Sequence, residues 1–113
     1  EAIALNNVFF EQGKPVLKPE SYPELDRLVI ILKENPTMEI MLSGHTDNVG
    51  NPTSLLALSQ ARVGAVKDYL VKNGIAAGRI TGKGYGSEKP LVKNDTEENR
   101  KMNRRVEFKV TRK

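Results

Sequence analysis

Two kinds of hydrophobic spacing alternate along this chain, and their order limits the folds that it can adopt. Every second residue is apolar in stretches that predict strands with one buried face, at residues 3–9, 38–43 and 106–110, and more weakly at 79–86. Apolar residues recur every three or four positions in stretches that predict amphipathic helices, at residues 21–34 and 53–72. A shorter helix is expected over residues 94–105.

A sheet with helices packed against it buries both kinds of apolar surface. We therefore expect an α+β fold with a mixed sheet of the βαβαβ type, about four strands, two main helices packed on it and one short helix. A chain of 113 residues is expected to form one domain, residues 1–113, with one modest core. Because it starts with a strand-like stretch and no initiator methionine, we interpret it as a fragment of a longer protein.

Residues near the helix ends support these boundaries. Ser21 and Glu24 have the spacing of a capping box, which predicts the start of the first helix. Thr53 or Ser54 is expected to cap the second helix. Gly74 is expected to follow its C-terminus, because glycine readily adopts the positive φ of a helix C-cap.

Composition excludes more functions than it indicates. There is no cysteine and only one histidine, so thiol chemistry, disulfides and the usual zinc sites are excluded. A net charge of +4 favours an acidic partner, such as nucleic acid, anionic lipid or a carboxylate-rich polymer. No nucleic-acid-binding motif accompanies this charge. No apolar run approaches the roughly 18 residues that are needed to span a bilayer.

One charged residue of the second predicted helix conflicts with the apolar pattern around it. Arg62 lies near the middle of a helical face that contains Leu55, Leu58, Ala61, Ala65, Val66 and Tyr69. A guanidinium stays charged in such surroundings, so it needs a carboxylate partner or a hydrated cavity. Asp47, in the loop between the second strand and this helix, is the expected partner.

The expected proximity of Asp47 and Arg62 has two interpretations. In the first, they form a buried ion pair that only holds the loop against the helix. In the second, both charges face a shared pocket and bind a zwitterion, with Asp47 accepting an ammonium group and Arg62 binding a carboxylate. The two residues alone leave both interpretations open.

The remaining polar motifs indicate no catalytic machinery. His45 has no second ligand at metal-binding spacing and is expected to hydrogen-bond to the loop backbone. The stretch "GKGYG", Gly82 to Gly86, lacks the pattern of a phosphate-binding loop and favours close backbone packing at a strand end. The adjacent Arg104 and Arg105 should point to opposite faces, so either one turns toward the pocket or the basic cluster is a solvated face.

Five stretches in this order, "SGHTDNVG", "LSQARVGAVKDYL", "NGI", "GKGYGSEKP" and "NRRVEF", resemble the OmpA-like peptidoglycan-binding domain. The resemblance extends from "NNVFF" to "VEFKV" and so covers nearly the whole chain. It implies the fold predicted above, as the C-terminal part of a longer envelope protein. It also implies non-covalent binding of the peptide stem of peptidoglycan, chiefly of its diaminopimelate.

The resemblance further implies which residues bind. The family's key aspartate and arginine fall on Asp47 and Arg62, the two residues that the helix-face argument selects. Secondary contacts are implied for Thr46, Asn48, Val49 and Phe10. Leu55 stands where the family often has asparagine, so one polar contact is expected to be missing or supplied elsewhere. The resemblance implies no catalytic residue, metal ligand or cofactor.

From the resemblance we expect a non-catalytic anchor in the periplasm of a Gram-negative bacterium, which tethers an outer-membrane protein or lipoprotein to the cell wall. The alternative within the family is the wall-binding domain of a flagellar stator or another envelope complex. Peptidoglycan is the expected partner and nucleic acid is not, while any membrane contact would belong to the rest of the longer protein. A homodimer is left open. The rival from another class is a hydrolase acting on the same peptide.

Overall fold

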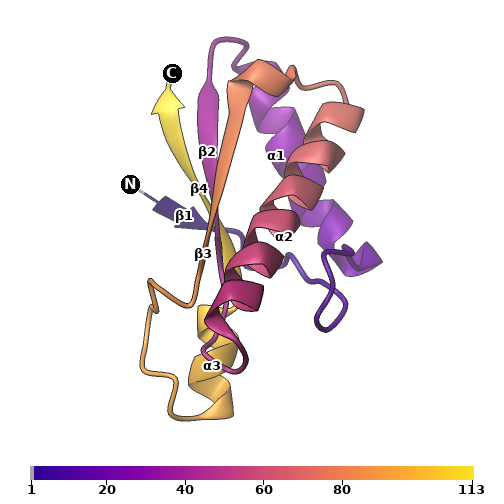
Figure 1. Cartoon of the computed structure of the whole chain (residues 1–113). Coiled ribbons are helices and arrows are strands. Elements are labelled where there is room, and N and C mark those ends of the chain that lie inside the picture. The colour runs from indigo at the N-terminus through magenta and orange to yellow at the C-terminus, as the bar shows by residue number, and fades with distance from the viewer. Residues whose placement is uncertain (1) are drawn as a thin grey trace.

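The computed structural model describes residues 2–113, and over this range it confirms the predicted α+β class. The strands are β1 (Ala2–Ala4), β2 (Glu39–His45), β3 (Ile80–Gly86) and β4 (Arg105–Arg112). The α-helices are α1 (Tyr22–Glu34), α2 (Pro52–Lys72) and α3 (Glu97–Asn103). Helices α1 and α2 lie on one side of the sheet, and α3 lies at one end of the molecule (Figure 1). Within the described range, no helix is both long and apolar enough to cross a membrane.

The sheet is mixed, and its strand order is β1-β4-β2-β3. β4 is antiparallel to both β1 and β2, whereas β2 and β3 are parallel and are connected through α2. The carboxyl-terminal ends of β2 and β3 therefore lie side by side at the same end of the sheet. The loop over residues 46–51 starts there, since the Thr46 amide donates a hydrogen bond to the Gly86 carbonyl at 2.9 Å.

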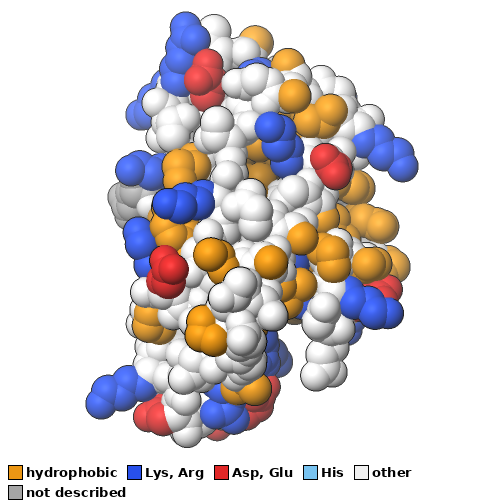
Figure 2. Space-filling model, viewed as in Figure 1, with side chains coloured by type: hydrophobic (Ala, Val, Ile, Leu, Met, Phe, Trp, Pro, Cys, Tyr) orange, Lys and Arg blue, Asp and Glu red, His pale blue; other side chains and the backbone are white. Residues whose placement is uncertain are grey.

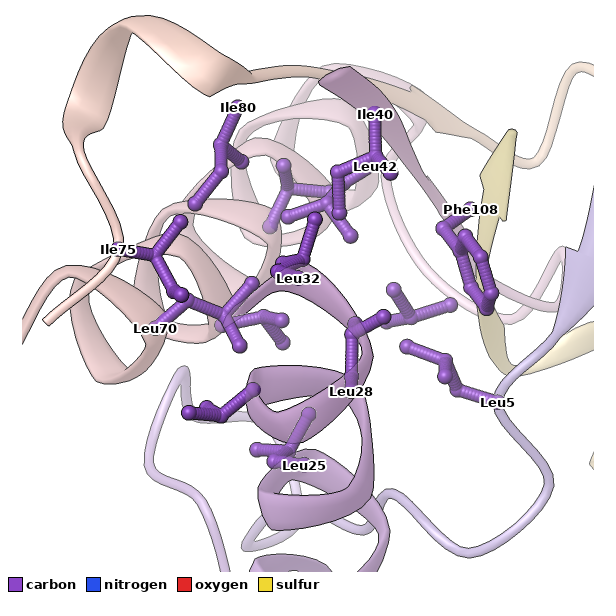
Figure 3. Close-up of a cluster of buried hydrophobic side chains, with 14 residues drawn as sticks. Leu5, Leu25, Leu28, Leu32, Ile40, Leu42, Leu70, Ile75, Ile80 and Phe108 are labelled. Atoms are coloured by element: carbon purple, nitrogen blue, oxygen red, sulfur yellow. The ribbon is translucent and has the colours of Figure 1, made fainter. Parts of the chain in front are cut away.

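The core lies between the two main helices and the inner face of the sheet (Figure 3). The residues predicted to form the buried stripe of α1 are all buried, namely Leu25, Leu28, Val29 and Leu32. They share one cluster with Leu42 of β2 and Phe108 of β4. The predicted C-cap of α2 is confirmed, because Gly74 has a φ of 103° and the next residue, Ile75, is 2% exposed.

The starts of the two main helices differ from the predicted capping. The Ser21 hydroxyl makes no cap hydrogen bond, and instead it donates to the Phe9 carbonyl at 2.8 Å and accepts from the Phe9 amide at 2.7 Å. The cap of α2 is Asn51, whose Oδ1 accepts hydrogen bonds from the amides of Thr53 and Ser54 at 2.9 and 3.2 Å. Asn51 therefore fixes the junction between the 46–51 loop and α2.

The first predicted strand is much shorter than its apolar pattern indicates. Leu5 is buried, but Ile3 and Phe9 are 50% and 41% exposed, and pairing in β1 ends at residue 4. Beyond it the chain forms a loop whose two ends are joined by a β-bridge between Phe10 and Leu17. This 10–17 loop is the part of the N-terminal segment that reaches the side chains of α2.

Strand β3 lies so close to α2 that two of its residues have no space for a side chain. A Cβ atom on Gly84 would lie 2.3 Å from the backbone nitrogen of Gln60. One on Gly82 would lie 2.3 Å from Cγ1 of Val63. These contacts confirm the close backbone packing predicted for the "GKGYG" stretch. Because these two residues have no side chain, α2 can pack closely against β3.

Candidate functional site

A cavity of about 870 Å³ lies where the end of β2, the first turns of α2, the N-terminal segment and α3 come together. Figure 1 shows α3 next to the loop that connects β2 to α2. Both predicted primary residues, Asp47 and Arg62, line this cavity. So do three of the predicted secondary contacts, Phe10, Thr46 and Val49, whereas Asn48 is not part of the lining. The volume is typical of sites that hold a drug-sized ligand.

Asp47 is held by a different arginine from the one predicted. Its Oδ2 accepts a hydrogen bond from Nη1 of Arg104 at 2.6 Å, and its Oδ1 accepts one from the Val49 amide at 3.0 Å. Within residues 2–113, no ion pair joins Asp47 to Arg62. The expected direct pairing of these two residues is therefore wrong, although both line the same cavity.

The register of the sheet explains why Arg104 reaches Asp47. β4 is antiparallel to β2 with Arg105 opposite His45, so the residue before Arg105 lies beside the loop that follows His45. Arg104 also donates a hydrogen bond from Nη2 to Oε2 of Glu97 at 2.6 Å. The hydrogen bond to Glu97, and then the one to Asp47, raises the pKa of Arg104 above its ordinary value. This confirms the interpretation in which one of the adjacent arginines turns toward the pocket.

Arg62 lies at the edge of the buried face of α2 rather than in its middle. The fully buried residues of the helix are Ser59, Val63, Val66 and Leu70, while Ala61 is exposed. Arg62 donates hydrogen bonds from Nε to the Lys14 carbonyl at 3.1 Å and from Nη2 to the Glu11 carbonyl at 3.3 Å. Its guanidinium carbon lies 4.9 Å from the centre of the Phe10 ring. The 10–17 loop thus holds the side chain by neutral groups only.

Three charged groups act on one another inside the cavity. Burial, and then the positive charge of Arg104, lowers the pKa of Arg62, whereas the negative charge of Asp47 raises it. An arginine still remains protonated at neutral pH. The cavity therefore contains a cation, Arg62, that forms no ion pair with a carboxylate of the described chain. Near it lies the carboxylate of Asp47, and each of its two oxygens accepts one hydrogen bond.

His45 does not hydrogen-bond to the loop backbone, contrary to the prediction. It is the last residue of β2 and is 6% exposed, and neither ring nitrogen has a hydrogen-bond partner in the described chain. The ring stacks on Tyr85 with 5.4 Å between centroids, and Nε2 lies 3.8 Å from Oε1 of Glu107. Burial, and then the positive charge of Arg105, lowers the pKa of His45 to about 4. His45 is therefore neutral at pH 7.

This lowered pKa predicts that the domain loses stability in mild acid. The ordinary histidine pKa is 6.5, so between pH 6.5 and about 4 the unfolded chain binds a proton that the folded domain does not. The free energy of unfolding should fall by up to about 3 kcal/mol across this window, and this contribution should level off below it. Denaturant unfolding at several pH values measures the loss.

The control for this experiment is His45→Phe, which keeps a ring against Tyr85 but cannot titrate. The variant should retain more of its stability on acidification than the wild-type domain does. An equal loss of stability in both proteins would show that other groups cause the acid sensitivity.

One supporting residue of the cavity, Asn103, was not predicted from the sequence. Asn103 is fully buried, and its Oδ1 accepts hydrogen bonds from the amides of Leu91 and Val92 at 2.7 and 3.0 Å. It thereby fixes the loop that brings Leu91 to the cavity. The available signal was its place directly before the two arginines in "NRRVEF". Leu55, which stands where the family often has asparagine, lines the cavity and places an apolar side chain there.

A four-stranded mixed sheet, two covering helices and a charged cavity at the end of β2 define a small α+β binding domain. The chain belongs to the OmpA family, whose model matches residues 9–104. It is 41% identical over 104 residues to outer membrane porin F of Pseudomonas fluorescens, an alignment that covers 92% of this chain and 32% of that protein.

Two further similarities extend over nearly the whole chain. It is 40% identical over 109 residues to the peptidoglycan-binding protein ArfA of Mycobacterium tuberculosis, covering 96% of this chain and 33% of that protein. Among solved structures, the cell wall anchor of the T6SS from Pseudomonas aeruginosa superposes with a TM-score of 0.82 at 29% identity, covering 99% of this chain and 80% of that one. The chain thus spans about a third of the length of these two curated relatives.

Proposed function

We propose that this domain binds peptidoglycan non-covalently through the diaminopimelate of the stem peptide, and that it anchors an outer-membrane protein or lipoprotein to the cell wall from the periplasmic side. The observation that carries the proposal is the cationic Arg62, which shares a cavity with the carboxylate of Asp47 without pairing with it. The free end of diaminopimelate bears an ammonium group and a carboxylate on one carbon. The similarities to the peptidoglycan-binding protein ArfA and to the T6SS cell wall anchor support binding to peptidoglycan.

The two side chains suit the two ends of this zwitterion. Nη1 of Arg62 makes no hydrogen bond within the described chain, so it can donate one to a ligand carboxylate. Each oxygen of Asp47 accepts one hydrogen bond, and a carboxylate has about four acceptor sites, so an ammonium group can bind beside Arg104. The Phe10 ring and the two loop carbonyls already order Arg62, which reduces the entropy lost on binding.

We propose binding without catalysis. Recognition of a zwitterion at equilibrium requires complementary charges and no bond cleavage. His45, the side chain at the cavity that would best suit a general base, hydrogen-bonds to no hydroxyl group within the described chain. A peptide hydrolase would need such a pair or a bound metal to activate its nucleophile.

The alternative role, as the wall-binding domain of a flagellar stator or another envelope complex, uses the same cavity and the same ligand. The similarity to the T6SS cell wall anchor supports this alternative as a second candidate role. The two roles differ in what the rest of the longer protein attaches to the wall.

The proposal predicts selection among stem peptides. A peptide with lysine in place of diaminopimelate would leave Arg62 without an anion, and so would a peptide in which that carboxylate is amidated. Losing one partner of a buried charged contact costs about 2–5 kcal/mol, and because Arg62 is only half-buried we expect the low end, roughly a 30-fold loss of affinity. Calorimetric titration with the three matched peptides measures the difference. Equal affinity for all three would contradict the role of Arg62.

A further inference from the structure

The cavity carries more positive charge than diaminopimelate can balance. Six cationic side chains line it, from Lys18, Arg62, Arg100, Lys101, Arg104 and Arg105, against the two carboxylates of Asp47 and Glu97. Three of these arginines have ion-pair partners, because Arg100 and Arg104 contact Glu97 and Arg105 contacts Glu107. Arg62, Lys18 and Lys101 have no ion pair within residues 2–113. Diaminopimelate would supply one carboxylate for Arg62 and nothing for the two lysines.

The two unpaired lysines come from different walls of the cavity. Lys18 directly precedes the short turn at Pro19–Ser21, in the N-terminal segment that also holds Arg62. Lys101 belongs to α3, the helix that carries Glu97. Both are exposed, and charged side chains gather at the end of the molecule where α3 lies (Figure 2). A ligand bound between Asp47 and Arg62 can therefore meet further positive charge on more than one side.

The size of the cavity also exceeds that of one amino acid. A volume of about 870 Å³ lies near the upper end of the range for sites that enclose drug-sized ligands. The residues that flank diaminopimelate in a stem peptide therefore have room inside the same cavity.

We propose that the cavity binds a second carboxylate of the stem peptide through Lys18 and Lys101. This inference rests on the proposed function and extends it from one residue of the ligand to the neighbouring ones. In stem peptides of this type, glutamate is joined to diaminopimelate through its γ-carboxyl group, so its α-carboxylate is free. The C-terminal residue of the stem offers another carboxylate. Both present the same chemistry to a lysine ammonium group.

A charge-matched pair of double variants tests the proposal. Lys18→Gln/Lys101→Gln removes the two cavity lysines, whereas Lys67→Gln/Lys109→Gln removes two lysines that do not line the cavity. The ligands are a diaminopimelate stem peptide, the same peptide amidated at the glutamate α-carboxylate, and the same peptide amidated at the C-terminus. Calorimetry gives each affinity, and thermal unfolding confirms that both variants are folded.

For the unmodified peptide, the cavity variant should bind about 3- to 20-fold more weakly than the wild-type domain, as expected for two exposed ion pairs. The control variant should bind like the wild type. For the peptide amidated at the carboxylate that the lysines contact, the cavity variant and the wild type should bind equally well. The amidation that removes the difference identifies which of the two carboxylates is bound.

Three results would overturn the inference. One is an unchanged affinity in the cavity variant. The second is an equal loss in both double variants, because the effect would then come from net charge alone. The third is a cavity variant that stays weaker by the same factor with both amidated peptides. A failure of the proposed function would give a different result from a failure of this inference. The Asp47→Asn variant would then bind the unmodified peptide as tightly as the wild-type domain does.

Discussion

Asp47→Asn and Arg62→Gln are each expected to abolish retention of the domain on purified sacculi of the diaminopimelate type, while the domain stays folded. Each change removes one charge at the site and keeps much of the side-chain volume. Truncating one partner of a buried charged contact costs about 2–5 kcal/mol, which corresponds to roughly a 30-fold to several thousand-fold loss of affinity. Co-sedimentation with sacculi measures binding, and circular dichroism measures folding.

The matched controls are Asp68→Asn and Arg27→Gln. Asp68 is exposed on α2 and Arg27 is exposed on α1, and neither lines the cavity. Both control variants should sediment with sacculi as the wild type does. If the Asp47 and Arg62 variants unfold, the two residues hold the fold together through their contacts to Arg104 and the 10–17 loop, and the proposed binding role loses its support. If they fold and bind normally, the ligand binds elsewhere.

Gly84→Ala is expected to lower the free energy of unfolding by about 3 kcal/mol, at the upper end of the range for overpacked interiors. The added methyl group would lie 2.3 Å from the backbone nitrogen of Gln60, so α2 must move away from β3 to admit it. A loss of this size lowers the melting temperature of a domain of this length by roughly 10 °C or more. Thermal and denaturant unfolding measure the change.

Gly64→Ala provides the matched control in the facing helix. A Cβ atom at Gly64 would meet no atom within 4 Å, and the residue lies inside α2. Alanine there should stabilise the domain by about 0.5–1 kcal/mol, because glycine in a helix interior loses more backbone entropy on folding. Opposite signs for the two glycines are the expected result. A Gly84→Ala variant as stable as the wild type would contradict the close contact between α2 and β3, and a Gly64→Ala variant less stable than the wild type would contradict the open space at Gly64.

The sequence predicts α1 well and the orientation of α2 poorly, for a physical reason. The apolar stripe of α1 packs into the main hydrophobic cluster, so counting hydrophobic residues identifies its buried side. α2 instead packs against the glycines of β3, where a small polar residue fits best. Ser59 is 1% exposed and its hydroxyl accepts a hydrogen bond from the Gly86 amide at 2.9 Å. A pattern based on hydrophobicity alone omits Ser59, and so it placed Arg62 too near the middle of the buried face.

In the candidate site, the positions of the key residues could be predicted from the sequence, whereas the partners that hold them could not. The loop position of Asp47 follows from local sequence, and so does the helical position of Arg62. Their partners depend on contacts between distant segments, since Arg104 lies 57 positions from Asp47 and Arg62 lies 48 positions from the Lys14 carbonyl. Backbone carbonyl groups have no residue-specific signature in the sequence, so the contacts that hold Arg62 could not be predicted from it.

The position of β4 inside the sheet has a consequence for the order in which this domain can fold. β4 follows the other three strands in the sequence, yet it lies between β1 and β2. While a ribosome is still making residues 105–112, β1 has no strand to pair with, and β2 can pair only with β3. The emerging chain thus cannot complete its sheet from the N-terminus onward, and pairing over such sequence distances slows folding. Arg104 arrives with the same last segment, so a nascent chain completes the candidate site only as its synthesis through β4 is completed.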